Sequence, residues 1–253
     1  MASNSSFHLS VGALVQTSFG TFFRSIVPFT LLGTLIMAPW IATHLWAVHN
    51  PMPPRPETSD VLEFALVQLV VLLLQVLLQY ALTGAVTYGV VQQLSGEPAS
   101  FATTVSKGLQ VFGRTLATGI LCGLRVLLYS LLLVVPGIME FCRLFVAIPA
   151  TVVEGTSASA SVERSKQLTD GCRWQVFASV LVVNVISWLV SALVVAGITM
   201  AGSSASSPVL IALPVALAVL FTTLSATVAA VCYSLLRRGK ENVDVKALSA
   251  VFA

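Results

Sequence analysis

Three ionisable residues lie inside apolar stretches of this sequence, where they could hold an ion or a polar group. Arg125 falls in the stretch 115–135, and Glu140 and Arg143 fall in the next stretch, 138–153. Glu140 and Arg143 are three residues apart, so they share one face of a helix. An ionised group at bilayer depth costs at least about 2.5 kcal/mol and normally faces the protein interior with a partner. The sequence therefore predicts a Glu140–Arg143 pair, which Arg125 could also approach.

Uncharged polar residues extend this candidate cluster to two further apolar stretches. In 61–94, one helical stripe is formed by Gln68, Gln75, Gln79 and Thr83. In 174–200, a similar stripe is formed by Asn184, Ser187 and Ser191. Such stripes either line a polar cavity or form hydrogen bonds between helices. The candidate intramembrane polar cluster consists of Arg125, Glu140, Arg143, Gln68, Gln75, Gln79 and Asn184.

Sequence signatures of catalysis and of metal binding are missing. The chain contains no GxSxG elbow, no HExxH motif and no phosphate-binding glycine loop. Its cysteines occur singly, without a CxxC pair: Cys122, Cys142, Cys172 and Cys232. We therefore expect a protein that is not an enzyme and that has no cofactor, no metal site and no disulfide.

The composition is typical of an integral membrane protein. Of the 253 residues, 57% are hydrophobic and only 9% are charged, whereas a soluble domain carries roughly 25% charged residues. So few charges cannot cover a soluble surface, and much of this surface must face lipid. The net charge of +3 is small and no dense basic run occurs, which argues against nucleic-acid binding. The expected partners are membrane lipids and other membrane proteins.

The apolar stretches predict an all-α fold, a polytopic transmembrane helical bundle in a single integral membrane domain. About six spans are expected, at 26–46, 61–94, 115–135, 138–153, 174–200 and 209–236, followed by a cytoplasmic tail at 237–253. Pro136-Gly137 should end the third span, and Pro149 should break the fourth. The alternative is four full spans with a re-entrant hairpin over 115–153.

An amphipathic segment at 7–24 precedes the first span. Its apolar residues recur near helical spacing, and Ser10 is available as an N-cap. We expect an interfacial helix lying on the membrane surface. The alternative is a helix packed on other protein.

The basic residues predict the orientation. With both termini in the cytoplasm, Arg55 lies outside and ten basic residues lie inside: Arg24, Lys107, Arg114, Arg164, Lys166, Arg173, Arg237, Arg238, Lys240 and Lys246. This positive-inside bias supports an even number of spans.

A cytoplasmic hinge is expected between the fourth and fifth spans, with Glu154, Arg164, Ser165, Gly171 and Trp174 as its main residues. Near-helical spacing relates Val162, Ser165, Leu168 and Thr169, and Gly171 suits a helix C-terminus. The pattern predicts a short amphipathic helix. Its basic residues either face lipid headgroups or pair with nearby acidic residues and the basic tail in a solvated cap.

The hinge region resembles a bacterial family of multi-span membrane proteins. The resemblance rests on PGI at 136–138, Arg143, Pro149, Glu154 and VERSKQLTDGCRWQVF at 162–177, and also on 95–109 and 231–252. The family includes the membrane domain attached to some glycerophosphodiester phosphodiesterases. The resemblance implies a six-span helical domain in the bacterial inner membrane. It does not supply a phosphodiesterase, because the catalytic part of those enzymes is a separate soluble barrel.

Three functions compete at this point. The first is a non-catalytic inner-membrane protein, an envelope scaffold or partner-binding module. The second is a transporter or lipid-handling protein that uses Arg125, Glu140 and Arg143 for an anionic substrate. The third, an intramembrane enzyme, has no identifiable nucleophile–base pair. A water-accessible cavity reaching Arg125 and Arg143 would favour transport, whereas a closed bundle with exposed grooves would favour a scaffold.

Overall fold

The computed structural model describes residues 9–50, 57–96, 101–200 and 208–241, and all regular structure among them is helical. The helices are α1 (Val11–Arg24), α2 (Ile26–His49), α3 (Thr58–Leu94), α4 (Phe101–Leu132), α5 (Val134–Leu144), α6 (Ala147–Glu154), α7 (Ala158–Thr169), α8 (Arg173–Met200) and α9 (Pro208–Glu241). Within these residues, six helical segments are long and apolar enough to cross a membrane. The all-α membrane bundle predicted from the sequence is confirmed. Residues 7–8 of the predicted interfacial helix and 242–253 of the predicted tail lie outside the described residues.

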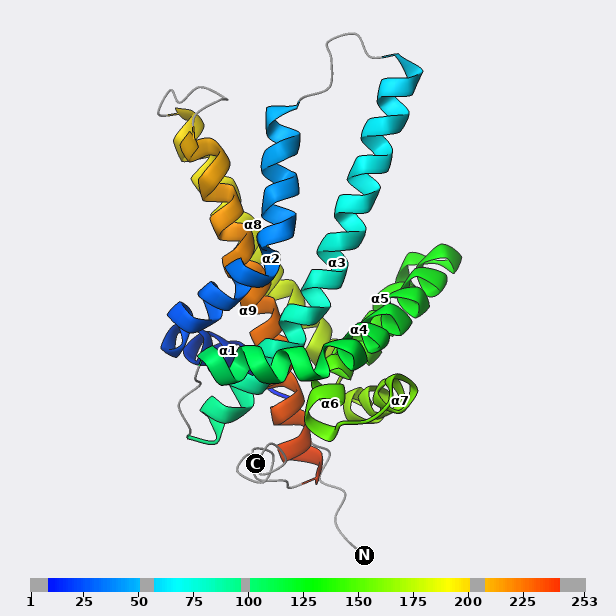
Figure 1. Ribbon diagram of the computed structural model, residues 1–253. Helices are drawn as coiled ribbons and strands as arrows, with labels where there is room; N and C mark the ends of the chain where they lie inside the picture. The colour runs from blue at the N-terminus through cyan, green and yellow to red at the C-terminus, as the bar shows by residue number, and fades with distance from the viewer. Residues whose placement is uncertain (1–8, 51–56, 97–100, 201–207, 242–253) are drawn as a thin grey trace, which may run out of the picture.

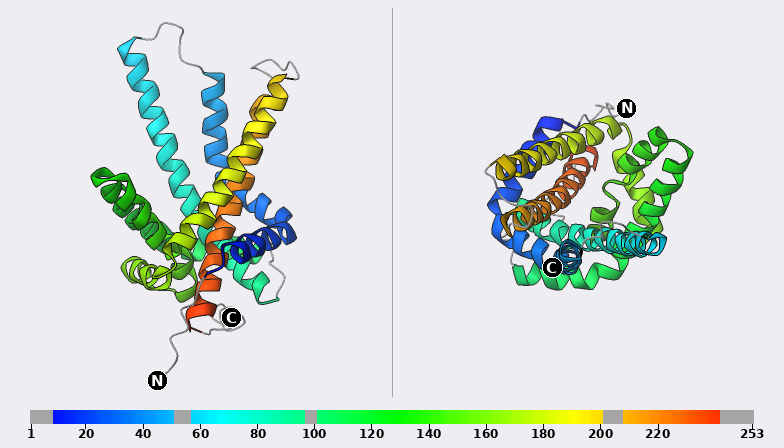
Figure 2. Two further views of the ribbon diagram at one scale, coloured as in Figure 1. Left: turned by 180° about the vertical axis from the view of Figure 1, so that it is seen from behind. Right: turned by 90° about the horizontal axis from the view of Figure 1, so that it is seen from above.

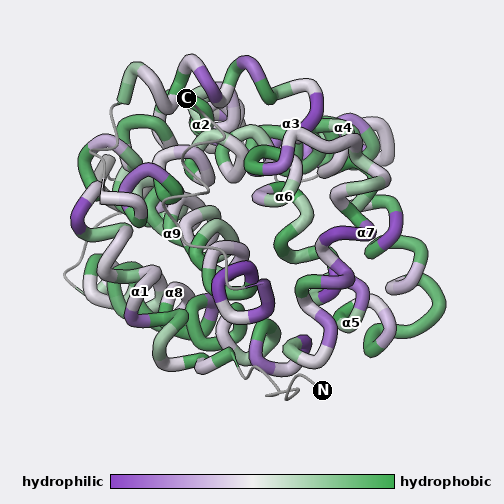
Figure 3. The backbone as a smooth tube through the Cα atoms, turned by 90° about the horizontal axis from the view of Figure 1, so that it is seen from below, coloured by the Kyte–Doolittle hydropathy of each residue, from purple (hydrophilic) through white to green (hydrophobic). Residues whose placement is uncertain are grey.

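The long helices pack together at one end of the molecule and spread apart toward the other (Figure 1). The packed end also holds α1, α6, α7, the first half of α4 and the last turns of α9 (Figures 1 and 2). Hydrophilic segments gather there, on α7 and at the end of α9 (Figure 3). We call this the basic end. The opposite, far end is formed by the end of α2, the start of α3, the end of α8 and the start of α9 (Figure 1).

The second half of α9 is the centre of the packed end. Ala230, Val231, Cys232 and Tyr233 have no exposed surface. This helix contacts α1, α2, α3 and α8, as well as α6 and α7. The small residues Ala226 and Ala230, four apart in the sequence, are both buried here, as expected for a close helix–helix contact in lipid.

Small side chains explain why the helices meet at the basic end. Gly84 of α3 lies against Thr115 of α4, and Gly108 of α4 lies against Ala85 of α3. The far half of α3 has large side chains that face outward: Val61, Leu62, Phe64, Leu66, Leu69, Val70, Leu72, Leu73 and Val76. Because lipid tails are as apolar as these side chains, there is no hydrophobic driving force that packs this half of α3 against α2, and only a well-fitting packing surface would hold a helix there.

The α4–α5 hairpin reaches less far toward the far end than the other long helices do. It leaves the basic end at a steep angle to α2 and α3, and its tip stops well short of the far end (Figures 1 and 2). Large apolar side chains at the tip are exposed, with no polar residue among them: Leu131, Leu132, Leu133, Val134 and Val135.

Several helix boundaries differ from those expected. The amphipathic stretch after residue 100 and the apolar stretch 115–135 form one continuous helix, α4. The chain turns at Leu133, which is extended, rather than at Pro136-Gly137. Pro136 lies in the first turn of α5, where its missing N–H breaks no helical hydrogen bond. The 138–153 stretch is likewise broken before Pro149, which occupies the first turn of α6.

The first helix, α1, and the end of the last helix, α9, also differ from expectation. The predicted N-terminal helix is present as α1, and the Ser10 hydroxyl caps it by accepting a hydrogen bond from the Ala13 N–H at 3.4 Å. It packs on α8 and α9 of its own chain, with Leu14 and Phe22 buried; its contact with the membrane surface stays a prediction. At the other end α9 continues to Glu241, so residues 237–241 are helical and do not belong to a tail.

The close approach of α3 and α4 can be tested at Gly108. A Cβ there would lie 2.7 Å from the Cβ of Ala85 and 3.2 Å from its Cα, so the helices would have to move apart. We expect Gly108→Ala to lower the free energy of unfolding by about 1–3 kcal/mol, as overpacking does. Gly113→Ala on the same helix meets nothing within 4 Å and should be neutral or stabilising, because alanine favours helix. Equal thermal stability of the two variants in detergent would contradict the proposed contact.

Candidate functional site

Glu140 is bound on both sides by arginines. Its side chain is 1% exposed, and Arg125 Nε donates a hydrogen bond to its Oε1 at 3.1 Å. Arg143 Nη1 donates to its Oε2 at 3.4 Å. The predicted Glu140–Arg143 pair is present, and Arg125 joins it. We call these three residues the Arg–Glu–Arg triad.

The hairpin geometry brings the triad together. Arg125 lies on α4 and Glu140 on α5, at similar distances along the chain from the turn at Leu133. One turn of α5 before Glu140, Gly137 lets the two helices approach closely, since a Cβ there would lie 2.9 Å from the Cα of Ser130. This approach allows the side chains to bridge the two helices.

The base of the triad is fixed to α7. The carbonyl of Arg143 accepts hydrogen bonds from the hydroxyls of Ser165 at 2.7 Å and Thr169 at 3.3 Å. Ser165 and Thr169 have no exposed surface. The hinge residue Ser165, singled out from the sequence, therefore positions α5 against α7.

The triad carries one more positive than negative charge and has hydrogen-bond donors to spare. Each guanidinium has five N–H donors, and the side chains of Arg125 and Arg143 are about one third exposed (33% and 32%). The Nε of Arg143 is buried and has no hydrogen-bond partner among the described residues. Such an arrangement can bind an anion through the arginines while Glu140 holds them in place.

The remaining members of the predicted polar cluster do not join the triad. Gln68 is exposed, and Gln75 and Gln79 are half-buried on α3. Asn184 is exposed, and its amide donates to the carbonyl of Val180 in its own helix at 2.9 Å. Asn184 therefore bonds to the preceding turn of its own helix and needs no partner helix. Among the described residues, no hydrogen bond or ion pair joins these four side chains to the triad.

A second group of ion pairs ties together three helices at the basic end. Glu154 at the end of α6 accepts hydrogen bonds from Arg164 Nε at 2.9 Å, Tyr233 Oη at 2.9 Å and Arg237 Nη1 at 3.4 Å. Glu241 pairs with both Arg164 and Arg237. We call these five residues the basic-end network. Its two arginines balance its two glutamates, so it joins α6, α7 and α9 without an excess of charge.

This network favours the solvated cap over the interpretation in which the basic residues of the hinge face lipid headgroups. Burial alone would lower the pKa of Arg164, but its bonds to Glu154 and Glu241 raise that pKa above the ordinary value. The other two basic residues of the hinge, Lys166 and Arg173, also pair with neighbouring carboxylates. The basic side chains are held in a cap of ion pairs, and the expectation that they turn toward headgroups is not supported.

The other hinge features agree with the sequence. Val162 and Leu168 are buried, and α7 is the expected short helix. Gly171 follows it with a φ of +73°, a conformation that glycine adopts without strain. Trp174, at the start of α8, is 73% exposed, as an interfacial side chain would be.

Three residues of the basic-end network escaped the sequence analysis. Tyr233 lies in the predicted span 209–236, and Arg237 and Glu241 both lie in the predicted tail 237–253. The signal was present in the spacing, because Arg237 and Glu241 are four residues apart, and such pairs lie on one face of a helix.

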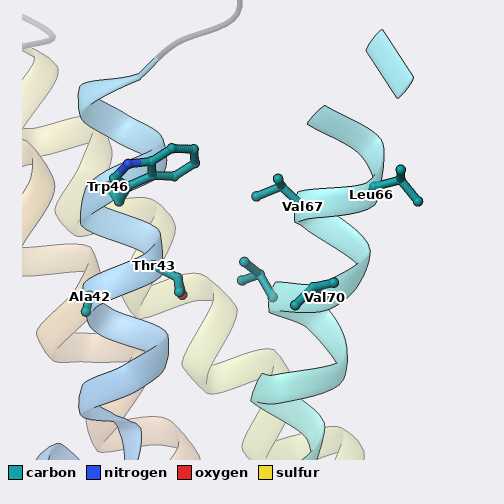
Figure 4. Close-up of a pocket in the computed structure, with 7 residues that line it drawn as sticks. Ala42, Thr43, Trp46, Leu66, Val67 and Val70 are labelled. Atoms are coloured by element: carbon teal, nitrogen blue, oxygen red, sulfur yellow. The ribbon is translucent and has the colours of Figure 1, made fainter. Parts of the chain in front are cut away.

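A groove separates α2 from α3 in the far half of the molecule (Figure 4). Its cavity volume is about 460 Å³, and its lining is Ala42, Thr43, Trp46, Leu66, Val67, Val70 and Val71. The hydroxyl of Thr43 donates to the carbonyl of Trp40 in its own helix at 2.8 Å, so the groove is effectively apolar. The triad does not line it.

The chain matches no protein-family model, no curated protein and no solved structure. The fold and composition alone define its class, an α-helical multi-pass membrane protein. The resemblance to the family that includes the phosphodiesterase membrane domain stays a prediction. Within the described part of the chain, no three His, Cys, Asp or Glu side chains are grouped so as to hold a metal ion.

The triad predicts an ordered series of stabilities. Glu140→Ala leaves two arginines without their carboxylate and should cost about 3 kcal/mol, the low end for a broken buried pair because both arginines are partly exposed. Replacing Glu140 and Arg143 together by Leu and Met should recover only part of this loss, since Arg125 is still unpaired. Replacing all three residues by apolar ones should recover most of it.

Thermal unfolding in detergent measures this series. Glu163→Ala is the control, because Glu163 is exposed and makes one pair with Lys166. A double variant as stable as the triple variant would mean that Arg125 does not depend on Glu140.

Proposed function

We propose that this protein is a non-catalytic membrane scaffold that binds a transmembrane helix of a partner protein in the groove between α2 and α3. The groove itself carries this proposal. A cavity of about 460 Å³ lined by apolar side chains of two diverging helices can accept a row of side chains from a third helix. The cytoplasmic orientation of the basic end and the location in a bacterial inner membrane belong to the same proposal, on the grounds of the positive-inside bias and the family resemblance.

The uneven burial of the long helices supports this function. In the most apolar stretch of α3 only 6% of the residues are buried, whereas 61% are buried in the corresponding stretch of α9. At 1.5 Å per residue α3 is about 55 Å long, against a hydrocarbon core of about 30 Å. The basic end therefore holds only part of α3, and the rest is free to contact another protein.

Transport of an anionic substrate is less well supported. That function requires a polar path through the membrane that reaches the arginines. The described groove is apolar and lies on α2 and α3, whereas the triad lies on α4 and α5. A packed end beside an exposed apolar groove agrees better with a scaffold.

A photoreactive amino acid at Val70 tests the partner directly in native membranes. Val70 lines the groove and is exposed, so we expect a discrete protein adduct, identified by mass spectrometry. Filling the groove by Ala42→Trp should abolish the adduct. The control Leu193→Trp, on the exposed face of α8, should leave it unchanged. Adducts with lipid alone, or a protein adduct that survives Ala42→Trp, would contradict the proposed function.

A further inference from the structure

The tip of the α4–α5 hairpin has the wrong chemistry for a water-exposed loop. Its exposed residues run Leu131, Leu132, Leu133, Val134 and Val135. The two connections at the far end have polar sequences, HNPMPPRPETSD at 49–60 and AGSSASSP at 201–208. Exposing the tip to water would cost free energy in proportion to its apolar area, whereas contact with acyl chains would cost none. The tip therefore belongs in the hydrocarbon.

The backbone at the tip is compatible with this position. The turn has one non-helical residue, Leu133, whose N–H donates to the carbonyl of Tyr129 at 3.2 Å. Its own carbonyl accepts from the N–H of Gly137 at 3.3 Å. Pro136 has no N–H to leave unpaired. These two bonds and the proline leave fewer unpaired backbone groups at the turn than two separate helix ends would, which lowers the cost of bringing it into the lipid.

The length of the hairpin then sets the depth of the triad. Glu140 and Arg143 follow Val134 by six and nine residues, which is about 9 and 14 Å at 1.5 Å per residue. Half of a hydrocarbon core is about 15 Å. These axial lengths are upper limits to the rise along the membrane normal, because the hairpin is inclined to α2 and α3 (Figure 1). A tip in the half of the hydrocarbon nearer the basic end therefore places the triad toward the headgroups of that side. A tip at the far surface would instead place it near the middle of the bilayer, where charged groups are least stable.

We propose that Arg125 and Arg143 bind the phosphate of an anionic lipid headgroup at the base of a re-entrant α4–α5 hairpin. Arginine donates two parallel hydrogen bonds to phosphate oxygens. Glu140 orients both guanidinium groups, and the excess positive charge favours a net anionic headgroup. The acyl chains lie along the outer face of α5, where Ile138, Met139 and Phe141 are exposed.

Lipid binding by the purified protein in a neutral detergent tests this site, independently of the partner groove. The probe is short-chain phosphatidylglycerol, compared with phosphatidylcholine of equal chain length and with inorganic phosphate. Arg125→Gln with Arg143→Gln should weaken phosphatidylglycerol binding about 30-fold, since each basic residue near an anionic headgroup contributes about a factor of five. The control Arg238→Gln removes an exposed arginine from the end of α9 and should change affinity less than twofold.

A second variant keeps the test valid if the double glutamine variant does not fold. Arg125→Lys with Arg143→Lys retains the pairs with Glu140 but loses the bidentate fork, and it should weaken binding several-fold. Ala42→Trp in the groove should have no effect. Equal affinity of wild type and both arginine variants would overturn the site. Equal binding of phosphatidylcholine would overturn the anionic preference, and equally tight binding of inorganic phosphate would overturn the lipid as its source.

Discussion

The buried carboxylate of Glu140 constrains this structure more than any other single group. An ionised glutamate that is 1% exposed is stable only if cations offset the hydration it has lost. Arg125 and Arg143 do so from two helices, and the carbonyl of Arg143 is held by α7. The carboxylate thus couples α4 and α5, and the Arg143 carbonyl fixes α5 to α7.

The two ends of the molecule are stabilised by different physics. At the basic end, glycines and other small residues let backbones approach, and the basic-end network joins α6, α7 and α9. Toward the far end the side chains are large and apolar, and helices in lipid gain little by burying them. As a result, the helices are packed together at the basic end, and α2 and α3 are separated toward the far end (Figure 1). An apolar groove between α2 and α3 follows from this division and requires no special motif.

The sequence predicted what depends on local spacing. Glu140 and Arg143 had to share a helix face, Ser10 was a suitable cap, and Gly171 was suited to end α7. Pro136 and Pro149 were expected to end or break helices, but each lies in the first turn of a helix. A proline is as compatible with the start of a helix as with the end of the preceding one. Asn184 was assigned to the cluster because a polar stripe looks the same whether it faces a partner or bonds to its own backbone.

The sequence offered both a spanning and a re-entrant form of the 115–153 hairpin, but it could not decide how far the hairpin reaches toward the far end. The segments Phe101–Leu132 and Val134–Glu154 are long and apolar enough to span, and hydropathy does not distinguish a span from a segment that enters and returns. The inclination of α4 depends on tertiary contacts instead, among them the close approach of α4 to α3 at Gly84 and Gly108. The hydrogen bonds from the end of α9 to Glu154 are also tertiary contacts. Tyr233 and Arg237 are 79 and 83 residues away from Glu154 in the sequence, so local spacing could not predict them.

The most direct measurement of this account is the accessibility of single cysteines to a membrane-impermeant maleimide in intact cells and inverted vesicles. The four native cysteines are all buried and would be replaced by alanine. A cysteine at Ser59, at the far end, should label only from outside, and one at Ser159, on α7, only from the cytoplasmic side. A cysteine at Val134, at the hairpin tip, should label from neither side until the membrane is dissolved. Labelling of Val134→Cys from the same side as Ser59→Cys would show that the hairpin spans the bilayer, and would contradict the re-entrant placement of the triad.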